Sequence, residues 1–416
     1  MLKNFIFTSE SVSSGHPDKV CDQISDAILD ECLRQDKGSR VAIETGIKSN
    51  TVMIFGELTT NAKIDFSNII KKTLTRIGYD NPVWGMDLNN LEIIERVTQQ
   101  SNEISQGVTK ENYELGAGDQ GIMFGFATSE TDSYLPMPIH LAHELMKEHE
   151  EFRKTELGKH IGPDAKSQVT VEYVDGIPQS IKTLVISTQH SKELDLPSLR
   201  ELIIENVIKP VLNTKWSDDI ELHINPSGTF HIGGPIADAG LTGRKIIVDT
   251  YGGFGRHGGG AFSGKDPTKV DRSAAYAARQ LAKDVVSRGI AKRCEVQISY
   301  AIGVVAPINI TFFTEEEITS EEIHEYYKNM LDIDLFEILK PHQIISRLKL
   351  KLPNYEKSAS YGHFGRKEFY WEDRIDQPFI SAILTDAEKQ RRLEDLEVLG
   401  ELNFPTALVL NKIRAA

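Results

Sequence analysis

Apolar residues recur at helix and strand spacings in an order that repeats along the chain. Residues 19–35 carry an apolar side chain at every fourth position, a step that lays one apolar stripe along a helix. Two segments of strand-like composition follow at 41–45 and 52–60, and a further amphipathic stretch predicts a helix over 66–77 that stops at Gly78. The predicted order is therefore helix, hairpin, helix.

The same order recurs twice further along the chain. The later segments are a helix near 139–153, a hairpin over 168–188 and a helix near 197–212, and then a helix over 271–287, two strands within 294–313 and a helix over 321–331. Successive hairpins start about 127 and 126 residues apart. This regular spacing favours three related αββα modules, although helix-flanked hairpins are common enough for chance to be the alternative.

Such modules predict an α+β fold of three similar αββα-type domains in a pseudo-threefold arrangement, each a β-sheet covered by helices, and not a doubly wound parallel sheet. The expected parts are an N-terminal domain (1–102), a mobile lid or linker (103–113), a central domain (114–233), a C-terminal domain (234–375) and a C-terminal extension (376–416), with segments that can interleave in space. Composition leaves open whether the polar, glycine-punctuated stretch 99–114 is a lid or a passive linker.

The composition is that of a soluble globular protein, since 40% of the 416 residues are hydrophobic and 26% are charged. No apolar run approaches the roughly 20 residues that span a bilayer. The first ten residues turn acidic too early for a secretory signal. Three cysteines without a C-x-x-C pair make disulfides and a thiolate zinc site unexpected. We therefore expect a cytoplasmic protein that does not bind membranes.

The charge balance, 61 acidic against 47 basic side chains and −14 net, argues against nucleic-acid binding, which depends on neutralising phosphates. A basic strip nevertheless occupies residues 238–272, with seven glycines between Gly252 and Gly264. Its cations are Arg244, Lys245, Arg256, Lys265, Lys269 and Arg272. Glycine-rich backbone lets N–H groups approach an anion, so we favour a polyanion site over an ordinary solvated loop.

Two motifs in this strip match other families only in part. Residues 253–258 read G-x-G-x-x-G after the strand-like segment 245–250, but the next helix is predicted near Asp271, too late for a dinucleotide-binding turn. Residues 259–265 match the start of a P-loop, but Asp266 stands where the magnesium-binding Ser or Thr belongs. Neither conventional site is expected.

A predicted helix carries His140, His143, Glu144 and His149, which could suggest zinc. They match neither H-E-x-x-H nor H-x-x-E-H. We interpret them as part of a solvated helix face.

Four carboxylates, those of Asp18, Asp119, Asp238 and Asp271, stand beside glycine, proline or another turn former. Hard oxygen ligands near phosphate-binding cations are what magnesium nucleotides require. Asp18 and Asp271 each lie at the start of a predicted helix, so an alternative role for either is a helix cap.

Four short motifs are distinctive: Gly15-His16-Pro17-Asp18-Lys19, and the strings from Gly116 to Gly121, from Gly258 to Asp266 and from Tyr361 to Arg366. Together they resemble the motifs of the methionine adenosyltransferase family, also called S-adenosylmethionine synthetases. The resemblance runs from about residue 5 to about residue 375. It implies three similar α+β domains, in agreement with the repeat described above.

The resemblance also implies a reaction. In this family the methionine sulfur attacks the ribose C5′ of ATP and expels the whole triphosphate, which is then hydrolysed to phosphate and pyrophosphate. A thioether has no proton to remove, so no general base is required. The catalytic demand falls on the leaving group.

The matching positions suggest a role for each candidate residue. By resemblance the catalytic residues are His16, Lys166, Arg244 and Lys265, with His16 beside the bridging oxygen that leaves C5′. The ATP-binding set adds Asp164 at the ribose, Phe230 stacked on adenine, Asp238, Lys245 and Ala261. Methionine would be held by Glu57, Gln100, Asp238 and Lys269, two Mg²⁺ ions by Asp18 and Asp271, and K⁺ by Glu44. Asp119 would lie in the site without an assigned role, and the residue pattern alone would make Phe230 a core aromatic.

Active sites in this family are assembled between two subunits, so the resemblance implies a homodimer or homotetramer. The chain departs from the family at 101–104, where Ser-Asn-Glu-Ile replaces the usual Ser-Pro-Asp-Ile, and in a long extension beyond about residue 376 that could pack on the body or bind a partner. Two rival hypotheses are a nicotinamide dehydrogenase that uses 253–258 and a regulatory subunit that has lost turnover. The full set of matched residue types weighs against the second.

Overall fold

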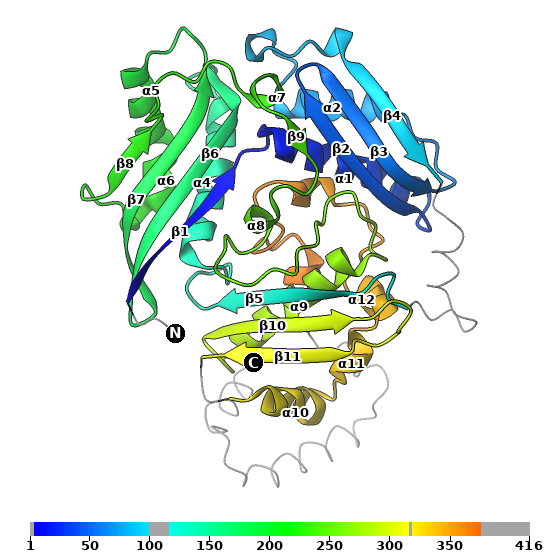
Figure 1. The fold of residues 1–416 in the computed structure, drawn as a ribbon. Coiled ribbons are helices and arrows are strands. Elements are labelled where there is room, and N and C mark those ends of the chain that lie inside the picture. Colours follow the sequence, from blue (N-terminus) through cyan, green and yellow to red (C-terminus); the bar gives the residue numbers. More distant parts are fainter. Residues whose placement is uncertain (1–3, 100–115, 316–317, 376–416) are drawn as a thin grey trace.

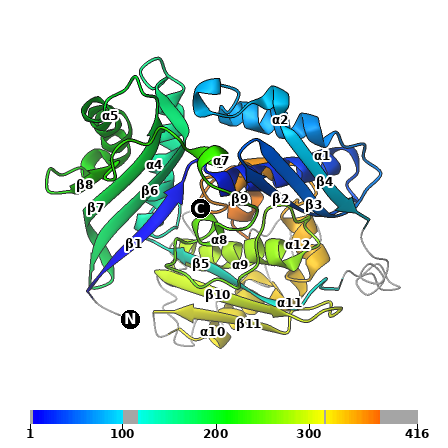
Figure 2. The same ribbon diagram turned by 45° about the horizontal axis from the view of Figure 1, so that its top comes forward.

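Three β-sheets stand around a common centre in the computed structural model, which describes residues 4–99, 116–315 and 318–375 (Figure 1). The short helix α8 (Ile246–Asp249) lies between the sheets, as both views show, and the strand β9 (Gly240–Leu241) is an edge strand of the first of them (Figure 2). The predicted lid at 103–113, Gln100 and the extension at 376–416 lie outside the described residues.

The first sheet has the strand order β4-β3-β2-β9. Its members are β2 (Arg40–Lys48), β3 (Thr51–Thr59), β4 (Glu92–Thr98) and β9. Helix α1 (Pro17–Gln35) packs against β2, and α2 (Phe66–Ile77) packs against α1. Gly78 ends α2 in a left-handed conformation at φ 103°, which glycine adopts without a steric penalty.

The second sheet has the order β1-β6-β7-β8, comprising β1 (Phe5–Val12), β6 (Ile161–Val174), β7 (Ile177–His190) and β8 (Glu221–Ile224). Helix α4 (Met137–Arg153) packs against β1 and β6. The helix predicted near 197–212 is α5 (Leu196–Ile203), a π-helical turn (Ile204–Ile208) and α6 (Lys209–Leu212) in direct succession.

The third sheet has the order β11-β10-β5, comprising β5 (Gly121–Thr128), β10 (Arg293–Tyr300) and β11 (Asn309–Thr314). Helix α9 (Val270–Ser287) packs against β5 and β10, and α10 (Ser320–Leu331) against β11. The shorter helical segments of the described chain are Pro82–Trp84, Leu88–Asn90, Asn213–Lys215, α7 (Gly234–Ala237), α8, α11 (Leu335–Ile338), α12 (Pro341–Arg347), Glu356–Ala359 and Tyr370–Glu372.

This architecture confirms the predicted α+β class, with three helix-covered sheets. Each sheet also takes a strand from a distant part of the chain. Strand β1 pairs with β6, β5 pairs with β10, and β9 pairs with β2. The predicted domain boundaries stay a prediction, and the sheets are shared across them.

Of two local predictions, the strand at 245–250 is wrong and the late start of the next helix is confirmed. The segment 245–250 is not a strand, because residues Ile246–Asp249 form the helical turn α8. The glycines at 253–258 open no helix, and the next one, α9, begins at Val270. A dinucleotide-binding turn is therefore absent at this motif. Over the described residues no helix combines the length and apolarity needed to cross a bilayer.

Candidate functional site

The N-terminus of α1 forms the base of the first group of candidate residues. The Nδ1 atom of His16 accepts the backbone N–H of Asp18 at 3.2 Å, so His16 caps the helix, and Pro17 occupies its first position. The capping role considered for Asp18 is therefore wrong. Asp18 lies in the first turn with its side chain free for other partners.

Asp18 is 1% exposed and gathers two cations of the basic strip. Its Oδ2 lies 2.6 Å from Nζ of Lys245, and its Oδ1 lies 3.5 Å from Nε of Arg244. The same Oδ1 accepts the backbone N–H of Leu241 at 3.0 Å. The pKa of Asp18 is lowered because the hydrogen bond and charge of Lys245 outweigh burial, which alone would raise it.

His16 is a neutral imidazole at physiological pH. Its pKa is lowered to about 3, first by burial and then by the charges of Lys245 and Lys166. Because Nδ1 accepts a hydrogen bond, the ring proton is on Nε2, which can donate one. We call His16, Asp18, Lys166, Arg244 and Lys245 the first charged cluster.

Asp164 and Asp238 lie beside this cluster. Burial, with a smaller contribution from the charge of Asp238, raises the pKa of Asp164 to about 6, although the N–H of Gly234 and the charge of Lys166 oppose the shift. Oδ2 of Asp164 accepts the backbone N–H of Gly234 at 2.7 Å. Asp238 is exposed and accepts the N–H of its neighbour Ala239. The predicted ribose-side and phosphate-side residues therefore lie close together.

Phe230 is partly exposed and belongs to neither hydrophobic core cluster of the described residues. The interpretation of Phe230 as a core aromatic is therefore wrong. An aromatic face that the core does not cover can stack on a planar ligand.

Sequence reasoning missed the residues that hold Arg244 and Lys245 in place. Lys19 is fully buried and pairs with Asp22 at 2.9 Å and with Asp249. Oδ1 of Asp22 accepts the N–H of Gly243 at 2.8 Å. The segment 240–249 is thus tied to α1 on both sides of its two cations.

A signal for these residues was present in the sequence. Asp18, Asp22, Asp26 and Asp30 follow one another at four-residue intervals, and all four are buried on one side of α1. A stripe of buried carboxylates requires partners. Each one accepts a backbone N–H from a distant segment.

The second charged cluster consists of Lys265, Asp266, Lys269 and Asp271. Nζ of Lys265 lies 2.6 Å from Oδ2 of Asp271. Lys269 pairs with Asp266, which is fully buried and also accepts the N–H of Val41. Lys269 itself occupies the N-cap position of α9 and Asp271 lies in the first turn, so the capping role considered for Asp271 is wrong.

Sheet register places Lys265 and Glu57 on the same face. Lys265 forms an isolated antiparallel bridge with Ala42, and Ala42 pairs with Glu57 across β2 and β3. Directly paired residues share a face, and the alternating positions Val41 and Ile43 are buried toward α1. Lys265, Glu57 and Glu44 therefore belong to the face that points away from α1, where both glutamates are exposed.

The two clusters are anchored at different points of one helix. Asp18 holds the first, while Asp26 accepts the N–H of Gly264 and pairs with Arg272 at 2.7 Å beside the second. These anchors lie eight positions apart in the α-helix, a rise of about 12 Å. Ala261 lies between them, because a Cβ added to Gly243 would lie 2.6 Å from the Cβ of Ala261.

The remaining candidates fall on either side of this division. Asp238 lies beside Asp164 near the first cluster, whereas Glu57 shares a sheet face with Lys265 and Lys269 belongs to the second cluster. The predicted methionine residues within the described chain are therefore divided between the two clusters. Asp119 is exposed and accepts the N–H of Gln120. It precedes Gly121, whose added Cβ would lie 3.8 Å from Oδ1 of Asp271, which places Asp119 near the second cluster.

The histidines of α4 do not form a solvated face, so that prediction is wrong for two of them. His143 and His149 are 2% and 0% exposed, and each donates or accepts one hydrogen bond, to Ser11 and Thr188 respectively. Both lie on the side of α4 that faces the sheet, where burial lowers their pKa.

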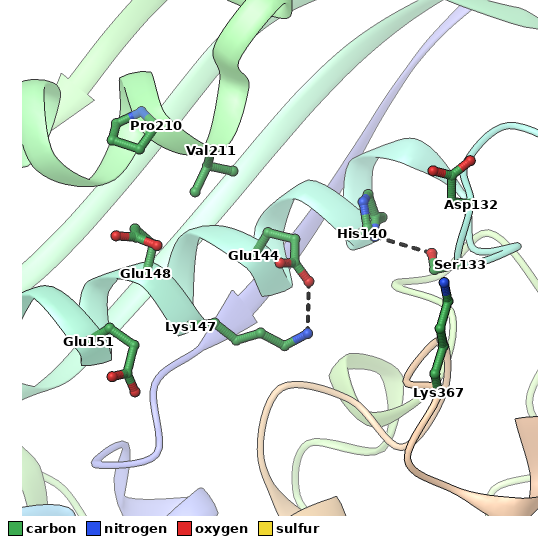
Figure 3. A pocket seen from close by; sticks show the side chains of 11 residues that line it. Asp132, Ser133, His140, Glu144, Lys147, Glu148, Glu151, Pro210, Val211 and Lys367 are labelled. Atoms are coloured by element: carbon green, nitrogen blue, oxygen red, sulfur yellow. Dashed lines mark hydrogen bonds and ion pairs between the residues drawn. The ribbon is translucent and has the colours of Figure 1, made fainter.

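Figure 3 shows a hollow of about 520 Å³ on the other side of α4. Its walls come from α4, α6, the turn at 132–133 and the loop at 365–367, and they carry both acids and lysines. His140 contacts Ser133 there at 3.1 Å. None of the candidate substrate or metal residues lines this hollow.

Each charged cluster can offer carboxylate oxygens to a divalent cation. Among the described residues no three His, Cys, Asp or Glu side chains converge on one point. Mg²⁺ is commonly bound through one or two carboxylates together with substrate phosphates and water. Asp18, beside Lys245 and Arg244, and Asp271, beside Lys265, are carboxylates that suit that mode of binding.

Comparison with known families gives three matches in sequence. The model of the S-adenosylmethionine synthetase N-terminal domain matches residues 4–102, that of the central domain matches 114–230, and that of the C-terminal domain matches 232–373. Between residues 4 and 373 only short gaps are left uncovered.

Proposed function

Because the chain belongs to the S-adenosylmethionine synthetase family, we propose that its two charged clusters hold the two ends of the triphosphate of ATP. The activity is that of a methionine adenosyltransferase. It transfers the adenosyl group of ATP to the sulfur of L-methionine, and the released triphosphate is hydrolysed to phosphate and pyrophosphate.

The main catalytic requirement is to stabilise a leaving triphosphate with about four negative charges. A cation about 4 Å from an anionic oxygen contributes on the order of 4 kcal/mol at the effective dielectric of a protein surface. Lys166, Arg244, Lys245 and Lys265 are assigned to this task. The anchoring of the two clusters on one helix is the observation that carries the assignment.

His16 is assigned to the bridging oxygen that leaves C5′. A neutral imidazole whose Nδ1 is already occupied by the helix N-terminus presents Nε2–H as a donor. It can donate to an oxygen that gains negative charge and needs no change of protonation state. The sulfur nucleophile requires no base, so no residue is assigned to proton removal.

Substrate orientation is assigned to the groups around the clusters. Phe230 would stack on adenine, Asp164 would bind the ribose, and Ala261 would contact ATP between the clusters. Methionine would be held by Glu57, Asp238, Lys269 and Gln100. Asp238 lies beside the first cluster and Glu57 beside the second. The methionine site is therefore complete only where residues of both clusters reach the same substrate molecule.

Enzymes of this family use Mg²⁺ and K⁺. Bound to a nucleotide, Mg²⁺ supplies positive charge to the phosphate oxygens. We assign Asp18 and Asp271 to two Mg²⁺ ions and Glu44 to K⁺. Asp18 and Asp271 are each paired with a lysine, and a Mg²⁺ ion could replace that lysine at the carboxylate while a phosphate binds the lysine. The support for Glu44 is that it is an exposed carboxylate on β2.

We further propose that active sites form between two copies of the chain, in a homodimer or homotetramer. The exposure of Arg244, Glu44, Glu57 and Asp119 supports completion by a second copy.

The decisive experiment is an incubation of the purified protein with ATP, methionine, Mg²⁺ and K⁺. Methionine-dependent release of both phosphate and pyrophosphate supports the function. Reduction of a nicotinamide cofactor, or ATP hydrolysis that ignores methionine, would contradict it. The mass of the assembly, measured by light scattering over a range of protein concentrations, tests the oligomer.

A further inference from the structure

The loop that carries Phe230 is tied to the end of strand β7, where Gln189 donates to the carbonyl of His231 at 3.3 Å and the next residue, His190, binds Phe230 itself. His190, the last residue of β7, is fully buried. Its backbone N–H donates to the carbonyl of Phe230 at 2.9 Å, and its Nε2 accepts the backbone N–H of Phe230 at 3.2 Å. Both backbone polar groups of the aromatic residue are therefore held by one partner.

The hydrogen bonds of His190 define its tautomer. Nδ1 lies 3.0 Å from the carbonyl oxygens of both Ser191 and Leu194, which can only accept. Nδ1 therefore carries the proton, and Nε2 is left as the acceptor that Phe230 requires. Burial lowers the pKa of His190 and favours this neutral form.

The following residues continue this attachment. Nδ1 of His231 donates to the carbonyl of His190 at 3.0 Å, and the two imidazole rings meet edge to face at 4.5 Å. Four residues after Phe230, Gly234 donates to Asp164 at 2.7 Å. The loop is thus fixed at one end by His190 and at the other by the proposed ribose ligand.

Close packing leaves the aromatic ring little freedom on its inner side. A Cβ added at Gly233 would lie 2.9 Å from Cε2 of Phe230 and 2.9 Å from Cδ of Gln189. Neither hydrophobic core cluster of the described residues includes this ring, so its position depends on this local packing together with the backbone attachment to His190.

We propose that His190 is a positioning residue for ATP, which holds Phe230 as a preorganised platform for the adenine ring. The inference rests on the proposed role of Phe230 in adenine binding. It predicts that loss of His190 changes KM for ATP and not KM for methionine, because His190 touches neither the charged clusters nor Glu57.

The test compares His190→Ala, His190→Gln and Phe230→Ala with the control His223→Ala, a partly exposed histidine on the neighbouring strand β8. Removing the acceptor should raise KM for ATP about tenfold, the equivalent of one lost hydrogen bond, and leave KM for methionine within about twofold. Gln carries an amide oxygen that can accept the Phe230 N–H, so His190→Gln should recover most of the loss. His223→Ala should behave like the unmodified chain.

Gly233→Ala provides a second variant, which places a methyl group against the Phe230 ring and the Gln189 side chain and leaves the His190 side chain unaltered. It should also raise KM for ATP selectively, and it keeps the inference testable should His190→Ala fail to fold. Thermal unfolding of each variant reports whether it folds.

Three results would overturn the inference. If Phe230→Ala leaves KM for ATP unchanged, the adenine assignment fails and this inference fails with it. If Phe230→Ala raises KM for ATP but His190→Ala and Gly233→Ala do not, the positioning role alone is wrong. If His190→Ala raises both KM values and Gln restores neither, His190 has a general structural role.

Discussion

The ammonium of Lys265 lies 2.6 Å from Oδ2 of Asp271, six positions further along the chain. The carboxylate holds the cation in place before any triphosphate arrives, so little reorganisation is needed when the phosphate binds. Lys265→Ala should lower kcat on the order of a hundredfold, as the loss of one preorganised charge commonly does. Lys72→Ala, an exposed lysine on α2, is the matched control and should change kcat little. Near-normal turnover of Lys265→Ala would show that the triphosphate is bound elsewhere.

Asp18→Asn keeps the size of the side chain and removes its charge. The half-saturating Mg²⁺ concentration should rise several-fold, because an amide oxygen is a weaker ligand for a hard cation. A titration of turnover with Mg²⁺ measures the change, and Asp80→Asn, at an exposed site on the surface, is the control. An unshifted titration would count against Asp18 as a metal ligand.

The buried pair of Asp26 and Arg272 should dominate the stability of the contact between α1 and α9. Both side chains are at most 1% exposed, two hydrogen bonds of 2.7 Å join them, and the guanidinium lies 4.2 Å from the ring centroid of Tyr355. Arg272→Met should destabilise the fold by about 3 to 5 kcal/mol, because it leaves a carboxylate buried without its partner. The double variant Asp26→Leu with Arg272→Met should be less destabilised. Urea unfolding of the unmodified chain, the single variant and the double variant measures these free energies. Equal losses of stability in the two variants would contradict the prediction.

The contribution of Asp30 to the free energy of unfolding should fall as pH rises. Burial raises its pKa to about 6 from the ordinary 3.8, although the N–H groups of Tyr355 and Glu356 oppose this shift. Between those two values the folded state binds more protons than the unfolded state, so the free energy of unfolding decreases toward neutral pH.

Asp30→Asn cannot titrate and isolates this contribution. The difference in unfolding free energy between the unmodified chain and the variant should fall by about 2 kcal/mol from pH 4 to pH 7. Denaturant unfolding at both pH values measures it. A difference that does not change with pH would mean that the carboxyl titrates normally.

Local periodicity was sufficient to predict the hairpins and most of their flanking helices. The predicted end of a helix at Gly78 and the hairpin over 168–188 depend on turn chemistry and short-range pattern, which a sequence displays directly. The strands β1, β5 and β9 could not be placed, because each pairs with a strand more than 100 residues away. The prediction of a strand at 245–250 is wrong for a related reason. Its apolar run suits a strand, but the anchoring of its neighbours to α1 shapes it into a helical turn.

The site was predictable by residue type but not by arrangement. The cations and carboxylates were identified from motifs, whereas their division into two clusters depends on which aspartate of α1 anchors which loop. His143 and His149 show the limit of reading a helix by polarity alone. Both are polar residues on the buried side of α4, where a single hydrogen bond compensates each of them in part.

The exchange of strands among the three sheets has a consequence for how the protein is made. Strand β1 leaves the ribosome long before its partner β6, and β5 long before β10. The first sheet also lacks its edge strand β9 until residue 241 has been synthesised. Nascent chains shorter than about 300 residues should therefore expose unpaired strand edges and depend on chaperones, and separately expressed thirds of the chain should aggregate.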